Sequence, residues 1–331
     1  MKSVNEKDNM LATTSHELSR RKFLGLSSAL ITGMTLPLPA ASLFSTDIEP
    51  IIDIHQHPDY VGRSAEQLLA HQQAMGISHT ILLPAGSIQN GASTNFGKSN
   101  GLEAEVTTNK AAYRFAKQHP EKFSFGANEV PDVPKAIKTI EKYLKKGGVV
   151  IGELKFNVES DSKEMQKIYQ LAQEYGVPVL MHWQFGRFNH GLDRFHKMLG
   201  KYPEVNFIGH AQTWWANIDK NHTDQTVMYP KGKVTPGGIT DRLLSDYPNM
   251  FADLSAGSGL NFMTRDEEQA KSFLQKHQDK LLYGSDCADK DGLDHAKCQG
   301  YNTIQEVKKL SGSKAIERKI LYQNAKSLFK L

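Results

Sequence analysis

Two histidines end the first strongly apolar run of the chain, IIDIHQH at residues 51–57. Side chains two positions apart in a β-strand point to the same face, so His55 and His57 would stand side by side where the strand ends. Such a pair of imidazoles can bind a metal ion, or it can be two hydrogen-bonded histidines of the core. The choice depends on what the rest of the chain brings to the same place.

Polar residues also close four later apolar runs. Glu153 and Lys155 lie in VVIGELKF, His182 in VPVLMHW, His210 in VNFIGHA and Asp286 in KLLYGSD. Taken singly, each has an ordinary explanation: a strand histidine is usually hydrogen-bonded in the core, Asp286 could cap a helix, and Glu153 could pair with Lys155. Together they are hard to explain by packing, since buried imidazoles and carboxylates are costly unless paired or metal-bound. We therefore predict a metal site at these strand ends.

The elements that would position these residues repeat along the chain. Short apolar runs alternate with segments whose apolar residues recur at spacings of three and four, which indicates strands followed by amphipathic helices. The runs cover residues 51–55, 78–85, 123–129, 149–156, 177–183, 205–211, 250–256 and 280–286. This order predicts an α/β fold, a single (β/α)₈ TIM barrel over residues 46–331, whose active site would lie at the C-terminal ends of the strands. An open doubly wound sheet would instead carry a glycine-rich phosphate turn after its first strand.

Two segments that follow predicted strands exceed ordinary loop lengths, at residues 86–100 and 212–237. Loops this long in a compact domain are usually lids or binding loops, and both would lie on the face of the predicted site. His190 and His295 lie close enough to the fifth and eighth strand ends to remain candidates for that site.

The cysteines and the remaining histidines carry weaker signals. Cys287 and Cys298 are the only cysteines of the chain, and two thiols do not make a disulfide framework. We expect them to be unpaired, although an oxidising compartment would permit a bridge. The other histidines, His71 and His277 among them, fall in helix-like or loop segments and are predicted to be surface residues.

Composition excludes several classes of partner. The 331 residues are 39% hydrophobic and 23% charged, which is typical of a soluble globular protein. The formal net charge is +4, of which residues 1–42 supply two, with five Lys and Arg against three Asp and Glu. The remaining surplus is too small, and too scattered, to indicate a nucleic-acid face or an anionic membrane surface. A small-molecule substrate is the expected partner, and a homo-oligomer remains open.

The N-terminal stretch indicates export. SRRKFLG at residues 19–25 resembles a twin-arginine signal, and a mildly apolar stretch and the small residues Ala40, Ala41 and Ser42 follow it. We therefore assign residues 1–45 to a signal peptide with a short linker and expect a periplasmic or otherwise exported protein. The apolar stretch is too short for a spanning helix, which leaves an amphipathic helix or an uncleaved anchor as alternatives.

The motifs DIHQH, VLMHW, FIGHA and LLYGSD, in this order, resemble the amidohydrolase superfamily and its amidohydrolase-related (type 2) branch. The C-terminal KILYQNAKSLFKL is similar to the helix that closes many of these barrels. The resemblance implies a distorted barrel that binds one or two divalent metals. His55, His57, His182 and Asp286 match the ligands of that branch, and His210 matches a histidine that acts on substrate or water or binds a second metal.

The fourth strand leaves the assignment open, because relatives place either a carboxylated lysine or a glutamate there. GELKF offers both, and we favour Glu153 near the metal and Lys155 near a substrate carboxylate or carbonyl. The ligand set suits Zn²⁺, with Mn²⁺, Fe²⁺ or Co²⁺ as alternatives. Candidate substrate contacts are Trp183, Arg187 and Trp214, for which ordinary packing is an equally good explanation.

The chemistry that follows is water activation, since a metal with an open position lowers the pKa of its water to about 7. Asp286 would accept the proton and pass it to the leaving group, and His210 would hold the water or polarise a carbonyl. We expect a hydrolase of an amide, ester or lactone. The alternatives are non-oxidative decarboxylation of a small, often aromatic, acid, an exported barrel that binds without turnover, and, weakest, a nuclease.

Overall fold

The computed structural model describes residues 49–99, 107–294 and 297–331, all within one compact unit. The expected signal peptide at residues 1–45 and His295 lie outside these described residues. Among the described residues, none of the helices combines the length and apolar character that crossing a bilayer requires.

The strands form the barrel that the sequence predicts. They are β1 (Ile52–Gln56), β2 (His79–Leu82), β3 (Phe123–Phe125), β4 (Ile151–Leu154), β5 (Val179–His182), β6 (Phe207–His210), β7 (Met250–Asp253) and β8 (Leu281–Leu282). Parallel pairing of successive strands forms one sheet from β1, β2 and β3 and another from β4, β5, β6, β7 and β8. A parallel bridge between Ala127 and Ile151 joins β3 to β4. Ile54 N–H donates to Tyr283 O (3.1 Å), and Asp286 N–H donates to His55 O (2.7 Å), which joins β8 to β1.

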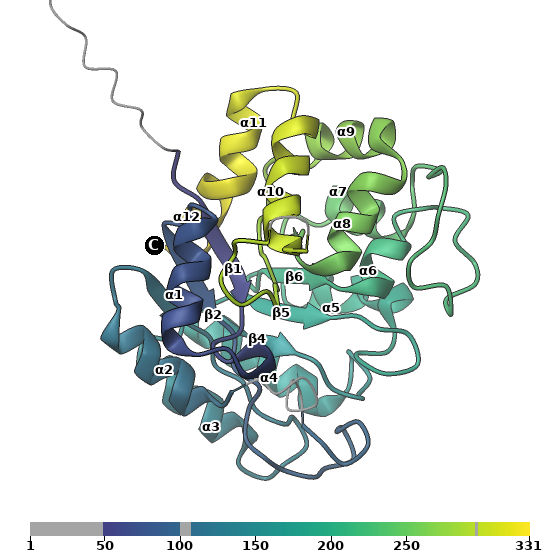
Figure 1. The fold of residues 1–331 in the computed structure, drawn as a ribbon. Coiled ribbons are helices and arrows are strands. Elements are labelled where there is room, and N and C mark those ends of the chain that lie inside the picture. The colour runs from purple at the N-terminus through teal and green to yellow at the C-terminus, as the bar shows by residue number, and fades with distance from the viewer. Residues whose placement is uncertain (1–48, 100–106, 295–296) are drawn as a thin grey trace, which may run out of the picture. The chain divides into compact units, whose positions relative to one another are not determined.

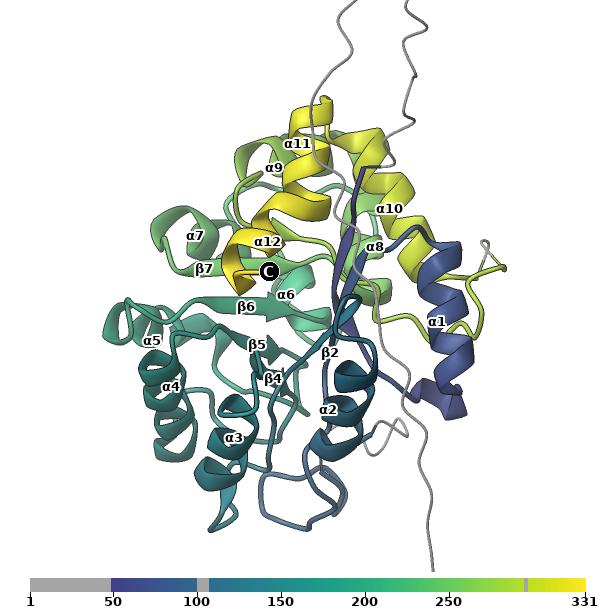
Figure 2. The same cartoon turned by 90° about the vertical axis from the view of Figure 1, so that its left-hand side faces the viewer.

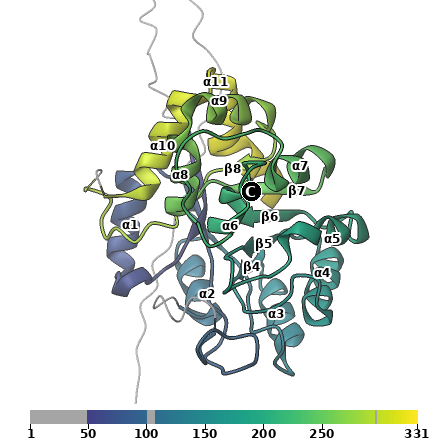
Figure 3. The ribbon, with the colours of Figure 1, turned by 90° about the vertical axis from the view of Figure 1, so that its right-hand side faces the viewer.

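Helices lie outside the strands (Figures 1 and 2). They are α1 (Ala65–Ala74), α2 (Asn109–Gln118), α3 (Ala136–Leu144), α4 (Lys163–Tyr175), α5 (His196–Lys201), α6 (Gln212–Ala216), α7 (Ile239–Asp246), α8 (Ala256–Arg265), α9 (Glu267–Lys276), α10 (Gln299–Leu310), α11 (Lys314–Arg318) and α12 (Asn324–Phe329). Local sequence sets their ends: Ser64 and Gln67 form a capping box at α1, and Gly176, with φ of 61°, ends α4. Helices α8 to α11 lie together on one side of the barrel (Figure 3).

The barrel interior is apolar at its lower end, where the strands begin, and polar at its upper end, where the strands end. Ile52, Leu180 and Ile208 pack together with Ala325 and Phe329 of the C-terminal helix, which therefore covers the lower end. Since alternate residues of a strand share a face, the face that buries Leu180 and Ile208 carries His182 and His210 at its upper end. On β1 the pairing register shifts between Asp53 and Gln56, and such irregularities re-aim side chains next to many active sites.

Candidate metal centre and active site

Six polar side chains converge at the upper ends of the strands. They are His55 and His57 from β1 and its end, Glu153 from β4, His182 from β5, His210 from β6 and Asp286 after β8. Nε2 of His57 lies 3.6 Å from Glu153 Oε2 and 3.5 Å from Asp286 Oδ1. Nε2 of His210 lies 3.6 Å from Glu153 Oε1 and 3.8 Å from Asp286 Oδ2. The structure therefore brings together every residue that the sequence proposed as a ligand or as the acid–base pair.

Acceptors from β7 and the residues after it orient two of these histidines. Oδ2 of Asp253 lies 2.7 Å from Nδ1 of His55, and Oγ of Ser255 lies 3.0 Å from Nδ1 of His210. The Ser255 hydroxyl in turn donates to Asp253 Oδ2 across 2.7 Å. Because a carboxylate can only accept, each neutral ring carries its proton on Nδ1 and keeps the lone pair on Nε2. This is the tautomer that a metal ligand needs.

The polar atoms that point toward the centre of the cluster suit a cation. His57 follows the same pattern, since its Nδ1 lies 2.8 Å from the carbonyl of Leu83 and its Nε2 faces the carboxylates. Nε2 of His55, Nε2 of His210 and Oδ1 of Asp286 are buried without a hydrogen-bond partner. Buried polar atoms are costly in that state, so three of them around one point indicate a ligand that accepts lone pairs. A divalent metal ion fits this description.

The electrostatics of the cluster support the same conclusion. Burial raises the pKa of Asp286 to about 7, and the Glu153 charge adds to the rise while His55 opposes it. Burial would lower the pKa of His55, but the surrounding carboxylates, Asp286 first, hold it well above its ordinary value. Burial lowers the pKa of His57 to about 3 and that of His210 well below its ordinary value. Without a metal, a protonated His55 supplies the positive charge that the carboxylates require; a divalent ion such as Zn²⁺ would take over that role and leave His55 neutral, with its Nε2 lone pair free to bind.

Glu153 is shared by two overlapping groups of donor atoms. One group joins it to His55 and His57, and the other joins it to His182 and His210. Its Oε1 also lies 2.5 Å from Nδ1 of His182. The strand-β4 carboxylate therefore lies where it could bind one ion or bridge two.

A small cavity of about 230 Å³ opens beside the cluster. His182, His210 and Asp286 form part of its wall, together with Lys155 and Tyr60. Lys155 follows β4 and is half-buried, with Nζ 5.6 Å from the centre of the Phe188 ring. The wall next to the predicted ligands is therefore polar and includes one primary amine.

The three other predicted substrate contacts lie elsewhere. Trp183 is fully buried and packs edge-on against Phe195 in the main apolar core. Trp214 is also fully buried, and its indole covers Gly209, which leaves no room there for a Cβ. The guanidinium of Arg187 lies over the rings of Phe96 and Phe188 and is absent from the cavity wall. We correct the placement of both tryptophans, because their large apolar rings gain more from burial than from facing a polar cavity.

Sequence reasoning missed Asp253 and Ser255, which orient the histidines. Both follow the same rule as the predicted ligands, since they close the apolar run MFADLSA at residues 250–256. The expectation of surface positions was also wrong for His71 and His277, which are buried at 0% and 4% exposure. Nε2–H of His277 donates to the Asp241 carboxylate across 2.7 Å, and such pairing permits burial.

Comparison with known proteins decides the family. The sequence model described as amidohydrolase matches residues 52–331, which is nearly all of the barrel. The chain belongs to the amidohydrolase family. This confirms the resemblance inferred from the strand-end motifs. No match was found among curated proteins.

Solved structures show that this amidohydrolase shares its fold with several TIM-barrel proteins. A barrel of uncharacterised function from Bordetella bronchiseptica matches with TM-score 0.57 and 14% identity, over 85% of this chain and 98% of its own. A probable 2-pyrone-4,6-dicarboxylic acid hydrolase from Acinetobacter baumannii matches with TM-score 0.54 and 16% identity, over 85% and 99%. A 2,6-dihydroxybenzoate decarboxylase from Rhizobium matches with TM-score 0.53 and 13% identity, over 86% and 99%. The barrel fold is thereby confirmed, and the proteins that share it include a probable hydrolase and a decarboxylase.

Proposed function

We propose that this amidohydrolase is a metal-dependent hydrolase of a small carboxylated molecule, cleaving an ester, lactone or amide bond with water. The observation that carries the proposal is that Nε2 of His55, Nε2 of His210 and Oδ1 of Asp286 are buried at the mouth of the barrel without a hydrogen-bond partner. Those atoms call for a divalent cation, and Zn²⁺ is our first choice. When bound, such a cation supplies Lewis acidity and lowers the pKa of water.

The ligands would be the imidazoles of His55, His57 and His182 with the carboxylates of Glu153 and Asp286. The shared position of Glu153 in two donor groups accommodates either one ion or two. The number of ions per chain is therefore a quantity to measure on the reconstituted protein.

Two residues of this chain would handle the proton. Asp286 lines the cavity with its side chain 13% exposed, so its carboxylate reaches both the donor atoms and the substrate space. It would take the proton of the attacking water and return it to the leaving group. His210, whose Nδ1 faces Ser255, presents Nε2 as an acceptor and would hold the water in line. The sequence left three roles open for His210, namely holding the water, polarising a carbonyl or binding a second metal, and we propose the first.

Lys155 supports a carboxylated substrate. It is a cation in the wall of a polar cavity that also holds Tyr60 and Gln184, and an ammonium beside the reacting centre suits a substrate carboxylate. The hydrolase and the decarboxylase named above also act on carboxylic acids, as their names state. The cavity volume of about 230 Å³ restricts the bound part of the substrate to a small molecule.

The test is a screen of carboxylated lactones, esters and amides with the metal-reconstituted full chain in ¹⁸O-labelled water. Hydrolysis places one labelled oxygen in the product. We expect Asp286→Asn to lower kcat by about 10²–10⁴-fold, whereas Asp279→Asn, a matched change at an exposed carboxylate that pairs with Lys319, leaves kcat unchanged. Full activity of Asp286→Asn, or activity that survives complete metal removal, would contradict the proposal.

Decarboxylation is the second candidate, because Lys155 beside the predicted metal would also hold an acid that loses CO₂. The same screen separates the two reactions. Release of CO₂ from an aromatic acid without uptake of labelled oxygen would assign the chain to the decarboxylases and overturn hydrolysis. Turnover of either kind would also exclude a barrel that only binds its ligand.

We also propose that the protein is exported, because of the paired arginines and the apolar stretch in its first 45 residues. Fractionation of cells that produce the full chain tests this. A protein found outside the cytoplasm, and retained inside it when Arg20 and Arg21 are both changed to Lys, is the expected result.

A further inference from the structure

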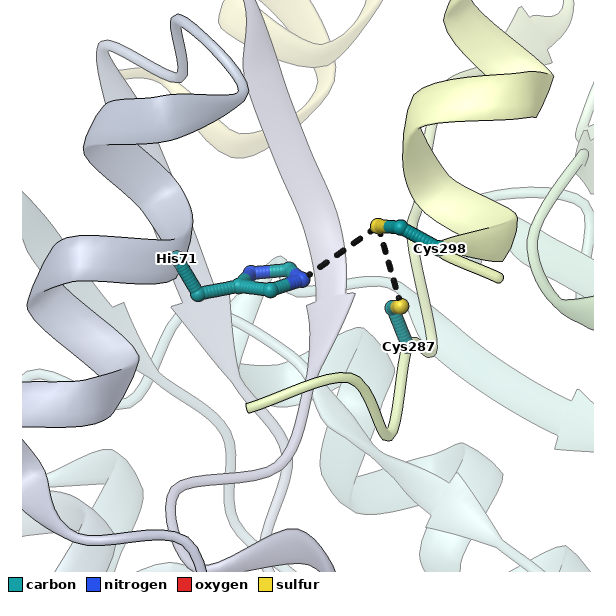
Figure 4. Close-up of side chains that lie close together, drawn as sticks. All are labelled: His71, Cys287 and Cys298. Atoms are coloured by element: carbon teal, nitrogen blue, oxygen red, sulfur yellow. Dashed lines mark hydrogen bonds between the residues drawn. The ribbon is translucent and has the colours of Figure 1, made fainter. Parts of the chain in front are cut away.

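A second group of side chains of metal-ligating types lies on the outer side of β1, next to the cluster described above but separate from it. His71 lies in α1, Cys287 lies in the segment after β8, and Cys298 is the N-cap residue of α10. All three are buried, at 0%, 1% and 0% exposure. The two Sγ atoms lie 3.2 Å apart, and Nε2 of His71 lies 3.5 Å from Sγ of Cys298 (Figure 4).

Hydrogen bonds fix the ring of His71 with its lone pair toward the sulfurs. The amide nitrogen of Gln72 donates to Asp53 Oδ2 (3.0 Å) and to Thr80 Oγ1 (2.6 Å), so Oε1 of Gln72 is the atom that faces His71. That oxygen lies 2.8 Å from Nδ1 of His71 and can only accept. The proton of the ring is therefore on Nδ1, and Nε2 points its lone pair at Cys298. Metal-binding histidines are commonly held in this way by an acceptor behind the ring.

A third sulfur completes the group. Sδ of Met75, directly after α1, lies 3.4 Å from Sγ of Cys298, and its side chain is 6% exposed. Two thiols, a thioether and an imidazole form a soft donor set, which selects Cu⁺ or Zn²⁺ over harder cations.

We propose that His71, Cys287 and Cys298, with Met75 as a weaker fourth donor, bind a thiophilic d¹⁰ cation, Cu⁺ or Zn²⁺. The described donor atoms of the first three all lie within 4.8 Å of one another. Two thiolates at about 2.3 Å from a tetrahedral ion stand about 3.8 Å apart, so a small outward shift of the sulfurs admits the ion. The ion is taken up when the two thiols give their protons to solvent, and no electron is transferred.

The site would hold three distant segments together next to the active centre. Cys287 directly follows Asp286, and its carbonyl accepts from the buried guanidinium of Arg63 (3.2 Å). Asp286 itself has φ of 42°, an uncommon conformation for a residue with a Cβ. An ion that ties Cys287 to α1 and α10 would keep the backbone of Asp286 in this conformation.

The test uses the metal-stripped, reduced full chain and Co²⁺ as a spectroscopic probe. Sulfur-to-cobalt charge transfer absorbs in the near ultraviolet, and the imidazole and carboxylate cluster at the barrel mouth cannot produce it. We expect the band in the wild type and in His57→Asn, its loss in Cys298→Ser, and a weaker band at equal cobalt concentration in His71→Asn. His119→Asn, at a half-exposed histidine outside both groups, is the matched control and should keep the band.

Further measurements identify the ion and exclude the alternatives. Chromophoric chelators selective for Cu⁺ and for Zn²⁺ give the affinity for each, and we expect at least one ion per chain to depend on Cys298. Two free thiols per denatured chain with no charge-transfer band in the wild type would show a hydrogen-bonded thiol pair and overturn the proposal. An intact mass lighter by two hydrogens before reduction would show a disulfide and overturn it as well. Both outcomes are read on the wild type, so a variant that fails to fold does not obscure the answer.

Discussion

Asp253 and His55 form a buried pair across 2.7 Å, although they lie 198 positions apart in the chain. Both side chains are fully buried. The pair joins β7 to β1 across the barrel mouth and sets which nitrogen of His55 faces the predicted metal. Asp253, which lies behind the imidazole ring, therefore sets the tautomer and orientation of a predicted metal ligand.

Replacing Asp253 by Asn should weaken metal binding while the fold is kept. The amide can turn a donor toward Nδ1 of His55, which would displace the proton and reverse the ring's tautomer. We expect metal affinity to fall by about 10–100-fold, measured by chelator competition. Asp279→Asn serves as the control, and an unchanged affinity in Asp253→Asn would show that the carboxylate has no orienting role.

Gly284→Ala should damage the centre through crowding. A Cβ at this position would lie 2.6 Å from Asp253 Oδ1 and 2.8 Å from Cβ of His55, closer than real contacts allow. We expect a loss of about 1–3 kcal/mol in the free energy of unfolding, together with weaker metal binding. Gly200→Ala is the control, because a Cβ there meets nothing within 4 Å. It should leave metal titration unchanged and, since Gly200 lies in helix α5, should raise the free energy of unfolding by about 0.5–1 kcal/mol.

Trp214→Phe tests the corrected position of this residue. Because its ring packs on Gly209 in the core, the change should lower the free energy of unfolding by about 1–3 kcal/mol and leave KM unchanged. Tyr229, which lines the cavity and is 47% exposed, provides the opposite case: Tyr229→Ala should alter KM with little effect on stability. Steady-state kinetics and urea unfolding measure both, and a raised KM in Trp214→Phe would return this residue to the substrate site.

Asp241 should give the fold a defined sensitivity to acid. Its hydrogen bond with His277, and then Lys276, holds the pKa of this carboxyl at about 2, below the ordinary 3.8. Because the pKa is lower in the folded state than in the unfolded state, the ionised carboxylate stabilises the fold at pH values above the unfolded-state pKa. This contribution is lost as the pH falls from about 4 to about 2. The full contribution is about 2 kcal/mol. Urea unfolding of wild type and Asp241→Asn should therefore differ at about pH 6 and converge toward about pH 2. A difference that stays constant with pH would contradict this assignment.

The candidate ligands could be predicted from sequence because a parallel barrel makes a local pattern into a spatial one. The C-terminal ends of all its strands meet at one face. A polar residue that closes an apolar run, such as His182 or His210, is therefore placed at that face by its own strand. The fold itself followed from the alternation of strand and helix patterns, for the same local reason.

Tertiary structure decided everything that depends on which side chains meet across the barrel. Asp253 carried the same local signal as the ligands, yet its role as the partner of His55 rests on pairing between distant strands. Trp183 and Trp214 lie near strand ends in the sequence, but their burial was fixed by packing against neighbouring elements.

The group of His71, Cys287 and Cys298 shows the same limit most clearly. His71 and Cys298 are 227 positions apart, and each alone looked like an isolated residue of a helix or loop. Sequence determines which face of a strand or helix a residue occupies, because that depends on local periodicity. Which distant faces come into contact is set by closure of the barrel and the docking of its helices, and only the folded chain specifies it.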